Sequence, residues 1–373
     1  MAETERKTCI AVLGALPPPW GGQAVMTQLL LDGEYESVNL RPVVMHFSRA
    51  TSDRGRMSLY KIAELFRVIL AVCLSRLCGS TILYYAPAGP ERGPLLRDAF
   101  VLMGTRWMFR KTIWHFHAGG FHEYQAANMV ERKLLSQAFG KPTMAIRLAE
   151  NSPRDDVAVK ARMACVVANG VPDPTQEYIP LRLTEPSRLL FIGVLNEGKG
   201  VGIIIDALAI LRKRGHSVCA DFVGEWASDS YRMEIEHRVR EYELTGIVLF
   251  HGTRTGVDKD RLLRQATIYC FPSSFIHENL PVTVIEAMAY SLPVIASSWR
   301  GIPDLVVDDV TGVIVPPCDA EATAQAISRL LVDPEERRRM GVAARERYVA
   351  RFTADRFHRR MDEVFTSVLQ AEL

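Results

Sequence analysis

The stretch "TIYCFPSSFIHENLPVTVIEAMAYSLPVIAS", residues 267–297, contains a strand, a loop, a helix and a second strand in one short passage. The apolar run 268–271 ends at a proline, as is typical of a buried strand that leads into a loop. Pro281 suits the first turn of a helix, where its missing N–H is not needed. The apolar run 293–297 predicts the next strand. Short apolar strands joined by helices indicate a parallel sheet covered by helices.

The same alternation extends over the whole chain and predicts two domains. It pauses at "EYIPLRLTEPSR", residues 177–188, which has the composition of a linker. We therefore expect an N-terminal Rossmann-like domain over residues 1–182, a C-terminal Rossmann-like domain over 183–352, and a final helix over 353–373. The stretch "FTADRFHRRMDEVFTSVLQ", residues 352–370, is predicted to be amphipathic and helical, because Phe352, Phe357, Met361, Phe365 and Leu369 recur at near-helical spacing.

Composition excludes several classes of protein. The chain has 373 residues, 48% of them hydrophobic, and a formal net charge of only +2, so the total charge gives no reason to expect nucleic-acid binding. The seven cysteines are scattered and form no CxxC pair, which fits a reducing cytoplasm better than a disulfide framework or a zinc ribbon. We expect neither a signal peptide nor a transmembrane segment, because the apolar run 66–79 is interrupted by arginines and is too short.

Two carboxylates stand at either end of the loop-to-helix passage, Glu278 in the loop and Glu286 inside the helix. Between them, the N–H groups at the helix N-terminus could bind an anion with the help of the helix dipole. Two hydrogen-bond acceptors beside a phosphate site would suit a nucleotide sugar, which has hydroxyls at both ends. The alternative is a solvated loop glutamate and a structurally paired helix glutamate.

The string "FPSSFIHENLPVTVIEAMAYSLPVIASSWRGIPDLVVDDVTGVIVPPCD", residues 271–319, resembles the signature of the family 4 retaining glycosyltransferases (glycosyltransferase group 1). "FIGVLNEGKG", residues 191–200, resembles the donor-binding motif of the same family. The resemblance implies the α/β GT-B fold, in which two doubly wound Rossmann-like domains face a central cleft and a C-terminal helix crosses back to the N-domain.

The resemblance also implies roles for individual residues. Glu278 would hydrogen-bond the transferred sugar as a catalytic residue, and Glu286 would bind the ribose. Lys199 would neutralise the diphosphate, although Val194 stands where the family usually has an arginine, so that one cation of a pair is missing. The remaining expected donor contacts are the backbone around Asn279, Leu280, Pro281 and Val282, and the backbone near Thr253 and Arg254 against the base.

In the N-terminal half, Gly21 and Gly22 lie between a predicted strand and helix, where glycine allows a tight turn and close approach to a phosphate. The family places this loop near the donor phosphates. His117 follows the strand of "KTIWHFHAGG" and matches the family's histidine near the reacting sugar. Its neighbours His115 and His122 leave a metal site open as an alternative, but no further ligand has convincing spacing.

No divalent metal or other cofactor is therefore expected. The "DKD" at Asp258–Asp260 mimics a metal-binding motif of another glycosyltransferase fold. We interpret these acids as helix-capping and first-turn charges of the helix that follows.

Residues 41–111 carry twelve basic and four acidic side chains, although the whole chain is almost neutral. The plain interpretation is solvated helix faces. The alternative is a surface for anionic lipid or a diphosphate-lipid acceptor, supported by the apolar run 66–74 and by the apolar residues 107–109.

We therefore expect a cytoplasmic enzyme that moves a hexose-like sugar from a nucleoside diphosphate to an acceptor hydroxyl with retention of configuration. Peripheral contact with the inner face of a membrane stays open as part of this expectation. The acceptor would be a polysaccharide, a lipid-linked glycan or another glycoconjugate. Two alternatives stay open: a sugar-nucleotide epimerase or hydrolase of the same fold, and a non-catalytic binding protein.

Overall fold

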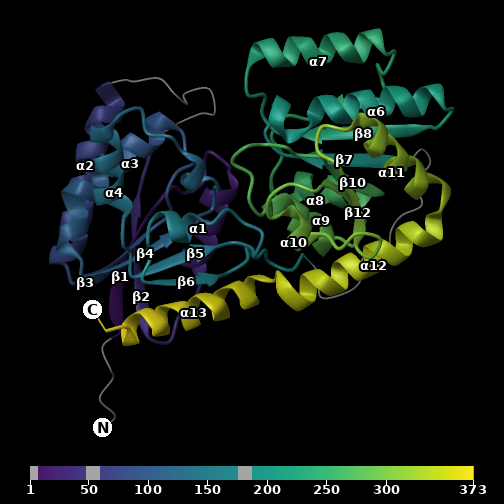
Figure 1. Ribbon diagram of the computed structural model, residues 1–373. Helices are drawn as coiled ribbons and strands as arrows, with labels where there is room; N and C mark the ends of the chain where they lie inside the picture. Colours follow the sequence, from purple (N-terminus) through teal and green to yellow (C-terminus); the bar gives the residue numbers. More distant parts are fainter. Residues whose placement is uncertain (1–6, 48–58, 175–186, 373) are drawn as a thin grey trace. The chain divides into compact units, whose positions relative to one another are not determined.

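The computed structural model describes residues 7–47, 59–174 and 187–372. It divides into two compact units, each of which is an α/β layer structure (Figure 1). Unit 1 comprises Met1–Asn169 and Ala354–Leu373, and unit 2 comprises Gly170–Thr353. The predicted boundary between residues 182 and 183, with most of the predicted linker, lies outside the described residues.

Unit 1 has a six-stranded parallel sheet with the order β2-β1-β3-β4-β5-β6. Its strands are β1 (Thr8–Gly14), β2 (Val38–Val44), β3 (Ser80–Tyr85), β4 (Lys111–His115), β5 (Met144–Arg147) and β6 (Met163–Val166). Its helices are α1 (Gly22–Asp32), α2 (Leu59–Leu77), α3 (Arg92–Thr105), α4 (Met129–Phe139), α5 (Asp155–Ala158) and α13 (Ala354–Gln370), with short 3-10 turns η2 (Arg106–Met108) and η3 (Phe121–Glu123).

Strands β1, β3 and β4 of unit 1 are largely apolar runs with helices packed on the sheet, as the sequence predicts. Helix α2 packs on β1, β2 and β3, and α3 lies between α2 and α4 (Figure 1). Leu83, Trp114 and Ala145, on three successive strands of the sheet, are fully buried in the core beneath these helices. This burial explains why these inner strands have continuous rather than alternating apolar patterns, whereas the edge strand β2 does not.

Helix α13 belongs to unit 1, although it follows unit 2 in the chain. The ring of Phe365 packs edge-on against Tyr35 with 5.0 Å between centroids, and the Tyr35 hydroxyl lies 3.2 Å from Nδ1 of His358. The helix begins at Ala354, so the sequence-based assignment of Phe352 to it was wrong: Phe352 is the C-cap residue of the preceding helix.

Unit 2 has a second six-stranded parallel sheet, with the order β12-β11-β10-β7-β8-β9. Its strands are β7 (Ser187–Ile192), β8 (Val218–Val223), β9 (Val248–Phe250), β10 (Ile268–Phe271), β11 (Val294–Ser297) and β12 (Gly312–Val315). Its helices are α6 (Val201–Lys213), α7 (Asp229–Glu241), α8 (Gly256–Gln265), α9 (Val282–Ala289), α10 (Ile302–Leu305), α11 (Ala320–Val332) and α12 (Pro334–Arg351), with the 3-10 turn η4 (Glu197–Lys199).

Close backbone packing joins the first two strands of unit 2 at their carboxyl ends. Gly224 follows β8 with φ of +149°, and a Cβ built on it would collide with the carbonyl oxygen of Gly193, which follows β7. Only glycine combines this dihedral angle with this approach. The contact fixes where the loop after β7 begins, and that loop carries Lys199.

Both sheets are parallel throughout and covered by helices, which confirms the predicted fold class. The run 66–79 is mostly part of α2, a surface-lying helix. In the part of the chain that the structure describes, every helix is too short or too polar to cross a bilayer.

Candidate functional site

The loop between β10 and α9 holds Glu278 at the carboxyl edge of the unit 2 sheet, where ligands bind in folds of this type. Pro281 is the N-cap residue of α9, and the helix begins at Val282. The prediction that Pro281 occupies the first turn was therefore wrong by one position. Its ψ of 119° is extended rather than helical, so the helix cannot extend back through Pro281, and residues 272–280 before it form a loop.

Glu278 forms an ion pair with Lys199, although the two residues are 79 positions apart. Lys199 Nζ lies 2.6 Å from Oε2 of Glu278, and the Ser273 hydroxyl donates to the same oxygen at 2.9 Å. The ammonium also lies 4.9 Å from the ring centre of Phe275, a distance at which cation–π attraction operates. Both charged groups are mostly buried, so the attraction between them is stronger than that of a solvated surface pair.

The loop that carries Lys199 is locked onto the loop that carries Glu278. The N–H of Ser274 donates to the carbonyl of Gly198 at 2.8 Å, and Asn196 caps η4 through the N–H of Lys199, also at 2.8 Å. Gly200 has φ of +83°, and a Cβ there would collide with the carbonyl oxygen of Pro272. These contacts hold the cation and the carboxylate in place before any ligand binds.

Glu286 lies on α9 and pairs with a cation that the sequence analysis missed. Lys259 Nζ, on α8, is 2.6 Å from Oε1 of Glu286. The two side chains open onto a small cavity within unit 2, lined also by Val171, Pro172, Pro174, Leu263, Ala289 and Tyr290. A half-buried carboxylate beside an apolar wall is suited to accept hydrogen bonds from a pair of hydroxyls.

Lys259 is the middle residue of the "DKD" triplet, and the structure corrects our interpretation of that triplet. Helix α8 begins at Gly256, so Asp258–Asp260 lie inside the helix rather than before it, and the N-cap residue is Thr255. Asp258 supplies first-turn charge, as predicted. Asp260 accepts from Arg264 at 2.8 Å and from the Tyr290 hydroxyl. In residues 7–47, 59–174 and 187–372, no group of three or more possible ligands is placed to hold a metal ion.

The other predicted donor residues of unit 2 are less closely assembled. Thr253 and Arg254 lie on the exposed loop between β9 and α8, and no described contact joins them to Glu278 or Glu286. Val194 lies between β7 and η4 as a half-buried apolar side chain. The cation that contacts Glu278 is therefore Lys199, with no charge from position 194.

In unit 1, the predicted residues lie at the carboxyl ends of β1 and β4. Gly21 is the N-cap of α1, and Gly22 is its first residue. Strand β4 ends at His115, and the ring of His117 packs over that of His115 with 4.1 Å between centroids. The Tyr84 hydroxyl lies 2.6 Å from Nδ1 of His115, whereas Nδ1 of His117 has no hydrogen-bond partner within the described residues.

Desolvation keeps both of these histidines neutral. It lowers the pKa of His117 to about 4, against a smaller opposing effect from a hydrogen bond with Asn169. Burial also lowers the pKa of His115 well below its usual value, and the nearby His117 lowers it further. A neutral imidazole of this kind can accept or donate a hydrogen bond near a reacting group without carrying charge.

These lowered pKa values predict that unit 1 loses stability in mild acid. Between about pH 6.5 and pH 4 the unfolded chain binds a proton at His117 that the folded chain does not, so the free energy of unfolding falls as pH falls. We expect a loss of about 2 kcal/mol between about pH 6.5 and pH 5, measured by urea unfolding. Asp155 acts in the opposite direction, because burial raises its pKa.

The control for this prediction is His117→Asn, which removes the titrating ring. The variant should show a shallower fall in the free energy of unfolding over the same pH range, although His115 still contributes. Equal slopes in the two proteins would show that the His117 ring does not titrate abnormally.

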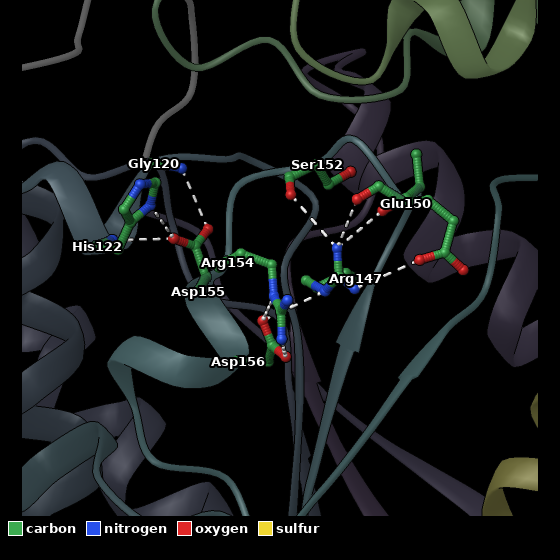
Figure 2. Close-up of polar contacts among 9 residues, drawn as sticks. Gly120, His122, Arg147, Glu150, Ser152, Arg154, Asp155 and Asp156 are labelled. Carbon is green, nitrogen blue, oxygen red and sulfur yellow. Dashed lines mark hydrogen bonds and ion pairs between the residues drawn. The ribbon is translucent and has the colours of Figure 1, made fainter.

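A second polar network, absent from the sequence analysis, holds the loops after β4 and β5 in unit 1 (Figure 2). The buried Asp155 carboxylate accepts from the backbone N–H groups of Gly120 and His122 and lies 3.1 Å from Nδ1 of His122. Arg147, at the end of β5, donates to the carbonyls of Ala149, Glu150 and Ser152. Because Asp155 anchors the loop that follows His117, we interpret it as a residue that positions that loop.

The structure therefore joins two of the predicted residues directly and places several others at the same sheet edges within each unit. In unit 2 it joins Lys199 to Glu278 and sets Glu286 beside the cavity, on the helix that begins just after the Glu278 loop. In unit 1 it places His117 beside His115, at the same edge of the sheet as the turn at Gly21 and Gly22.

Comparison with known proteins shows that the chain is similar to glycosyltransferases. Residues 176–347 match the family described as glycosyl transferases group 1. The amylovoran biosynthesis glycosyltransferase AmsK of Erwinia amylovora is 29% identical over 198 residues, which are 52% of this chain and 48% of AmsK. The chain thus spans about half the length of this curated relative.

Solved structures confirm the fold over nearly the whole chain. Sucrose-phosphate synthase from Thermosynechococcus elongatus superposes with a TM-score of 0.74 at 20% identity, covering 98% of this chain and 100% of that chain. HepE of Anabaena in complex with UDP superposes with a TM-score of 0.70 at 16% identity, covering 96% and 100%. At such identities the likeness establishes the fold, which is the GT-B fold predicted from the sequence.

Proposed function

We propose, from the match of residues 176–347 to the glycosyl transferases group 1, that this chain is a retaining glycosyltransferase. It would move a sugar from a nucleoside diphosphate to an acceptor hydroxyl. The observation that carries the proposal is the locked Lys199–Glu278 pair beside α9, whose Glu286 opens onto a cavity. The relative AmsK is named for amylovoran biosynthesis, and this supports a role in polysaccharide or other glycoconjugate synthesis.

Unit 2 would bind the donor. Glu286 would accept hydrogen bonds from the ribose hydroxyls, and Lys199 would neutralise the diphosphate. The backbone from Asn279 to Val282 would face the sugar and phosphate oxygens at the N-terminus of α9, where the helix dipole favours negative charge. HepE, which has the same fold, is described as a complex with UDP, and this supports a nucleotide donor here.

Donor binding would rearrange the Lys199–Glu278 pair. Within the described residues, the hydrogen bonds that the Glu278 side chain accepts from Lys199 and Ser273 both go to Oε2. Oε1 would therefore accept from a sugar hydroxyl, while the ammonium turns part of its hydrogen bonding toward the phosphate. Negative charge builds up on the diphosphate as it departs. A cation that stabilises this charge lowers the activation barrier of the transfer step rather than only tightening donor binding.

The reaction would proceed at the anomeric carbon with retention. The acceptor oxygen forms a bond to that carbon on the face from which the diphosphate leaves, and the electron pair of the breaking C–O bond goes to the diphosphate. The proton of the acceptor hydroxyl passes to a phosphate oxygen of the leaving group. No metal or other cofactor takes part in this proposal. Analysis of the product by NMR spectroscopy would establish its anomeric configuration.

His117 is proposed to act on the transfer step, from unit 1. We expect His117→Ala to lower the rate of transfer by about a hundredfold while leaving nucleotide affinity within about twofold. The measurements are initial rates and titration calorimetry with the nucleotide. His216→Ala is a control at a histidine on the loop after α6 in unit 2, and it should alter neither quantity. A large loss of nucleotide affinity in His117→Ala would contradict the assignment.

The proposal is tested by a thermal-shift screen against UDP, GDP, ADP and TDP and their sugars, with and without EDTA. A ligand at roughly a hundred times its dissociation constant stabilises the fold by about 2.7 kcal/mol. Stabilisation by one nucleotide that EDTA does not remove would support the metal-independent donor site. If no nucleotide stabilises the protein, a non-catalytic GT-B protein becomes the better description.

A sugar-nucleotide epimerase or hydrolase is distinguished by its products. Such an enzyme would convert the donor at full rate without any acceptor, whereas the transferase needs one.

The proposal also includes a cytoplasmic location and peripheral contact of unit 1 with an anionic membrane, because residues 41–111 are strongly basic.

A further inference from the structure

Helix α2 exposes a row of large apolar side chains along its whole length. The row consists of Leu59, Ile62, Phe66, Leu70, Leu74 and Leu77. Leu59 is 86% exposed and Phe66 is 66% exposed, so no side chain in the described part of the chain covers them. Spacings of three and four residues place all six on one face of the helix. A continuous apolar row of this length is rare on a soluble surface and indicates an interaction site.

The exposed row is the outer face of a helix whose inner face is fully packed. Val68 and Val72 are completely buried, and α2 rests on β1, β2 and β3. The inner face therefore fixes the rotation of the helix about its axis, and the apolar row points away from the sheet as a result.

The apolar surface continues onto the neighbouring helix and the turn after it. Phe100 and Met103 of α3 and Trp107 of η2 are exposed, with Trp107 at 77%. The two helices are in contact, because Ile69 of α2 packs beside Gly104 of α3. Arg76 of α2 donates to the carbonyl of Met108 at 2.9 Å, which joins the C-terminal end of α2 to η2. We call these nine apolar residues of α2, α3 and η2 the α2–α3 face.

The charged side chains of α2 and α3 that reach solvent are all positive, namely Lys61, Arg67, Arg76, Arg92 and Arg97. Arg67, Arg92 and Arg97 are each paired with a carboxylate. The acids on the two helices point inward: Glu64 is 5% exposed and Asp98 is fully buried, and each is paired with an arginine, Arg67 and Arg97 respectively. Solvent therefore meets apolar and cationic groups on this face, with no carboxylate of either helix among them.

We propose that the α2–α3 face docks on the surface of an anionic phospholipid bilayer. Helix α2 would lie parallel to the membrane plane with its apolar row at the boundary between headgroups and acyl chains, and the basic side chains would contact lipid phosphates. Trp107 would enter the interfacial layer, which suits an indole. The inference deepens the proposed function, on which it rests for the membrane contact of unit 1, by naming the surface that makes the contact.

Charge distinguishes a bilayer from a second copy of the chain as the occupant. In a symmetric dimer the same face meets itself, so the arginines of one copy would face those of the other. Like charges across an interface are unfavourable, whereas anionic headgroups neutralise them. A bilayer also fits an apolar row on a convex helix, which offers no groove for a partner.

The test is cosedimentation with vesicles, using the full chain. One set of vesicles is phosphatidylcholine alone, and the other is phosphatidylcholine and phosphatidylglycerol in equal parts. We expect binding to the anionic vesicles that weakens as salt is added. Replacing Phe66, Leu70 and Leu74 together with serine should reduce the partition coefficient by about tenfold or more, because three apolar side chains no longer leave water on binding.

A matched control replaces three exposed apolar residues of unit 2 with serine, namely Met233, Val257 and Val332. This variant should bind vesicles like the wild type. Trp107 supplies an independent readout: anionic vesicles should shift the tryptophan emission to shorter wavelength, and Trp107→Phe should lose most of that shift.

Equal binding by the wild type and the α2 variant, or equal binding to both kinds of vesicle, would overturn the proposal. So would light scattering that shows a dimer abolished in the α2 variant together with no vesicle binding by the wild type. Nucleotide thermal shifts on the same α2 variant keep the two proposals separate. A variant that loses vesicle binding but keeps nucleotide stabilisation supports the lipid surface, whereas a wild type that binds vesicles but no nucleotide refutes only the donor site.

Discussion

Glu278→Gln is expected to lower the rate of sugar transfer by about a hundredfold or more while leaving nucleotide affinity within a few-fold. The carboxylate holds Lys199 at 2.6 Å and accepts from Ser273, so the amide would lose both the charge and the geometry of this arrangement. Lys199 would remain mostly buried without its counter-charge, and we expect the free energy of unfolding to fall by about 1 to 3 kcal/mol. Initial rates, titration calorimetry and urea unfolding measure the three effects.

Glu197→Gln is the matched control for this variant. This substitution removes the same charge two residues before Lys199, but the Glu197 side chain is exposed on η4. It should retain nearly full activity and stability. If Glu278→Gln kept wild-type transfer, Glu278 would be removed from the catalytic site and the pair would be purely structural.

Glu286→Ala is expected to weaken nucleotide binding by about 10- to 100-fold, which corresponds to the loss of about 1.5 to 3 kcal/mol of charge-assisted hydrogen bonding to the ribose. The residue lies on α9 beside the cavity and is preorganised by Lys259 at 2.6 Å. Titration calorimetry with the nucleotide identified by the thermal-shift screen measures the change. The fold should remain stable, because both side chains retain some contact with water.

Two further variants test whether the loss of nucleotide affinity is specific to the carboxylate of Glu286. Glu241→Ala removes an exposed carboxylate from α7 in the same unit and should leave nucleotide affinity unchanged. Glu286→Gln keeps the shape and one acceptor, so its affinity should lie between those of the wild type and Glu286→Ala. Unchanged affinity in Glu286→Ala would remove Glu286 from the proposed donor site.

Much of the fold could be predicted from local patterns. The run 268–271, the proline before α9 and the run 293–297 correspond to β10, the N-cap and β11. Errors occurred at helix ends, where one or two residues decide the boundary. Helix α8 begins before the "DKD" triplet, and α13 begins after Phe352. Hydrophobic periodicity determines the type of an element well, but its ends depend on capping contacts that the pattern does not contain.

The residues of the candidate site were predicted individually, without the contacts that join them. Glu286 was expected to bind a ribose, but its partner Lys259 lies 27 residues away on another helix. Lys259 was missed because the two acids on either side of it were explained as capping and first-turn charges of their own helix. The Asp155 network in unit 1 was missed for a similar reason, because its carboxylate acts on backbone N–H groups more than 30 residues earlier. Sequence spacing gives no signal for such contacts.

The sequence by itself determined the class of fold, because continuous apolar strands alternating with helices can be buried only in helix-covered parallel sheets. It also determined that Glu278 and Glu286 lie on opposite sides of a helix start. Only the tertiary structure decided that Lys199 neutralises Glu278, and that α2 turns its leucines and Phe66 toward solvent. Both outcomes depend on which distant elements pack together, since that packing selects which face of a helix is buried and which charges meet in a low dielectric.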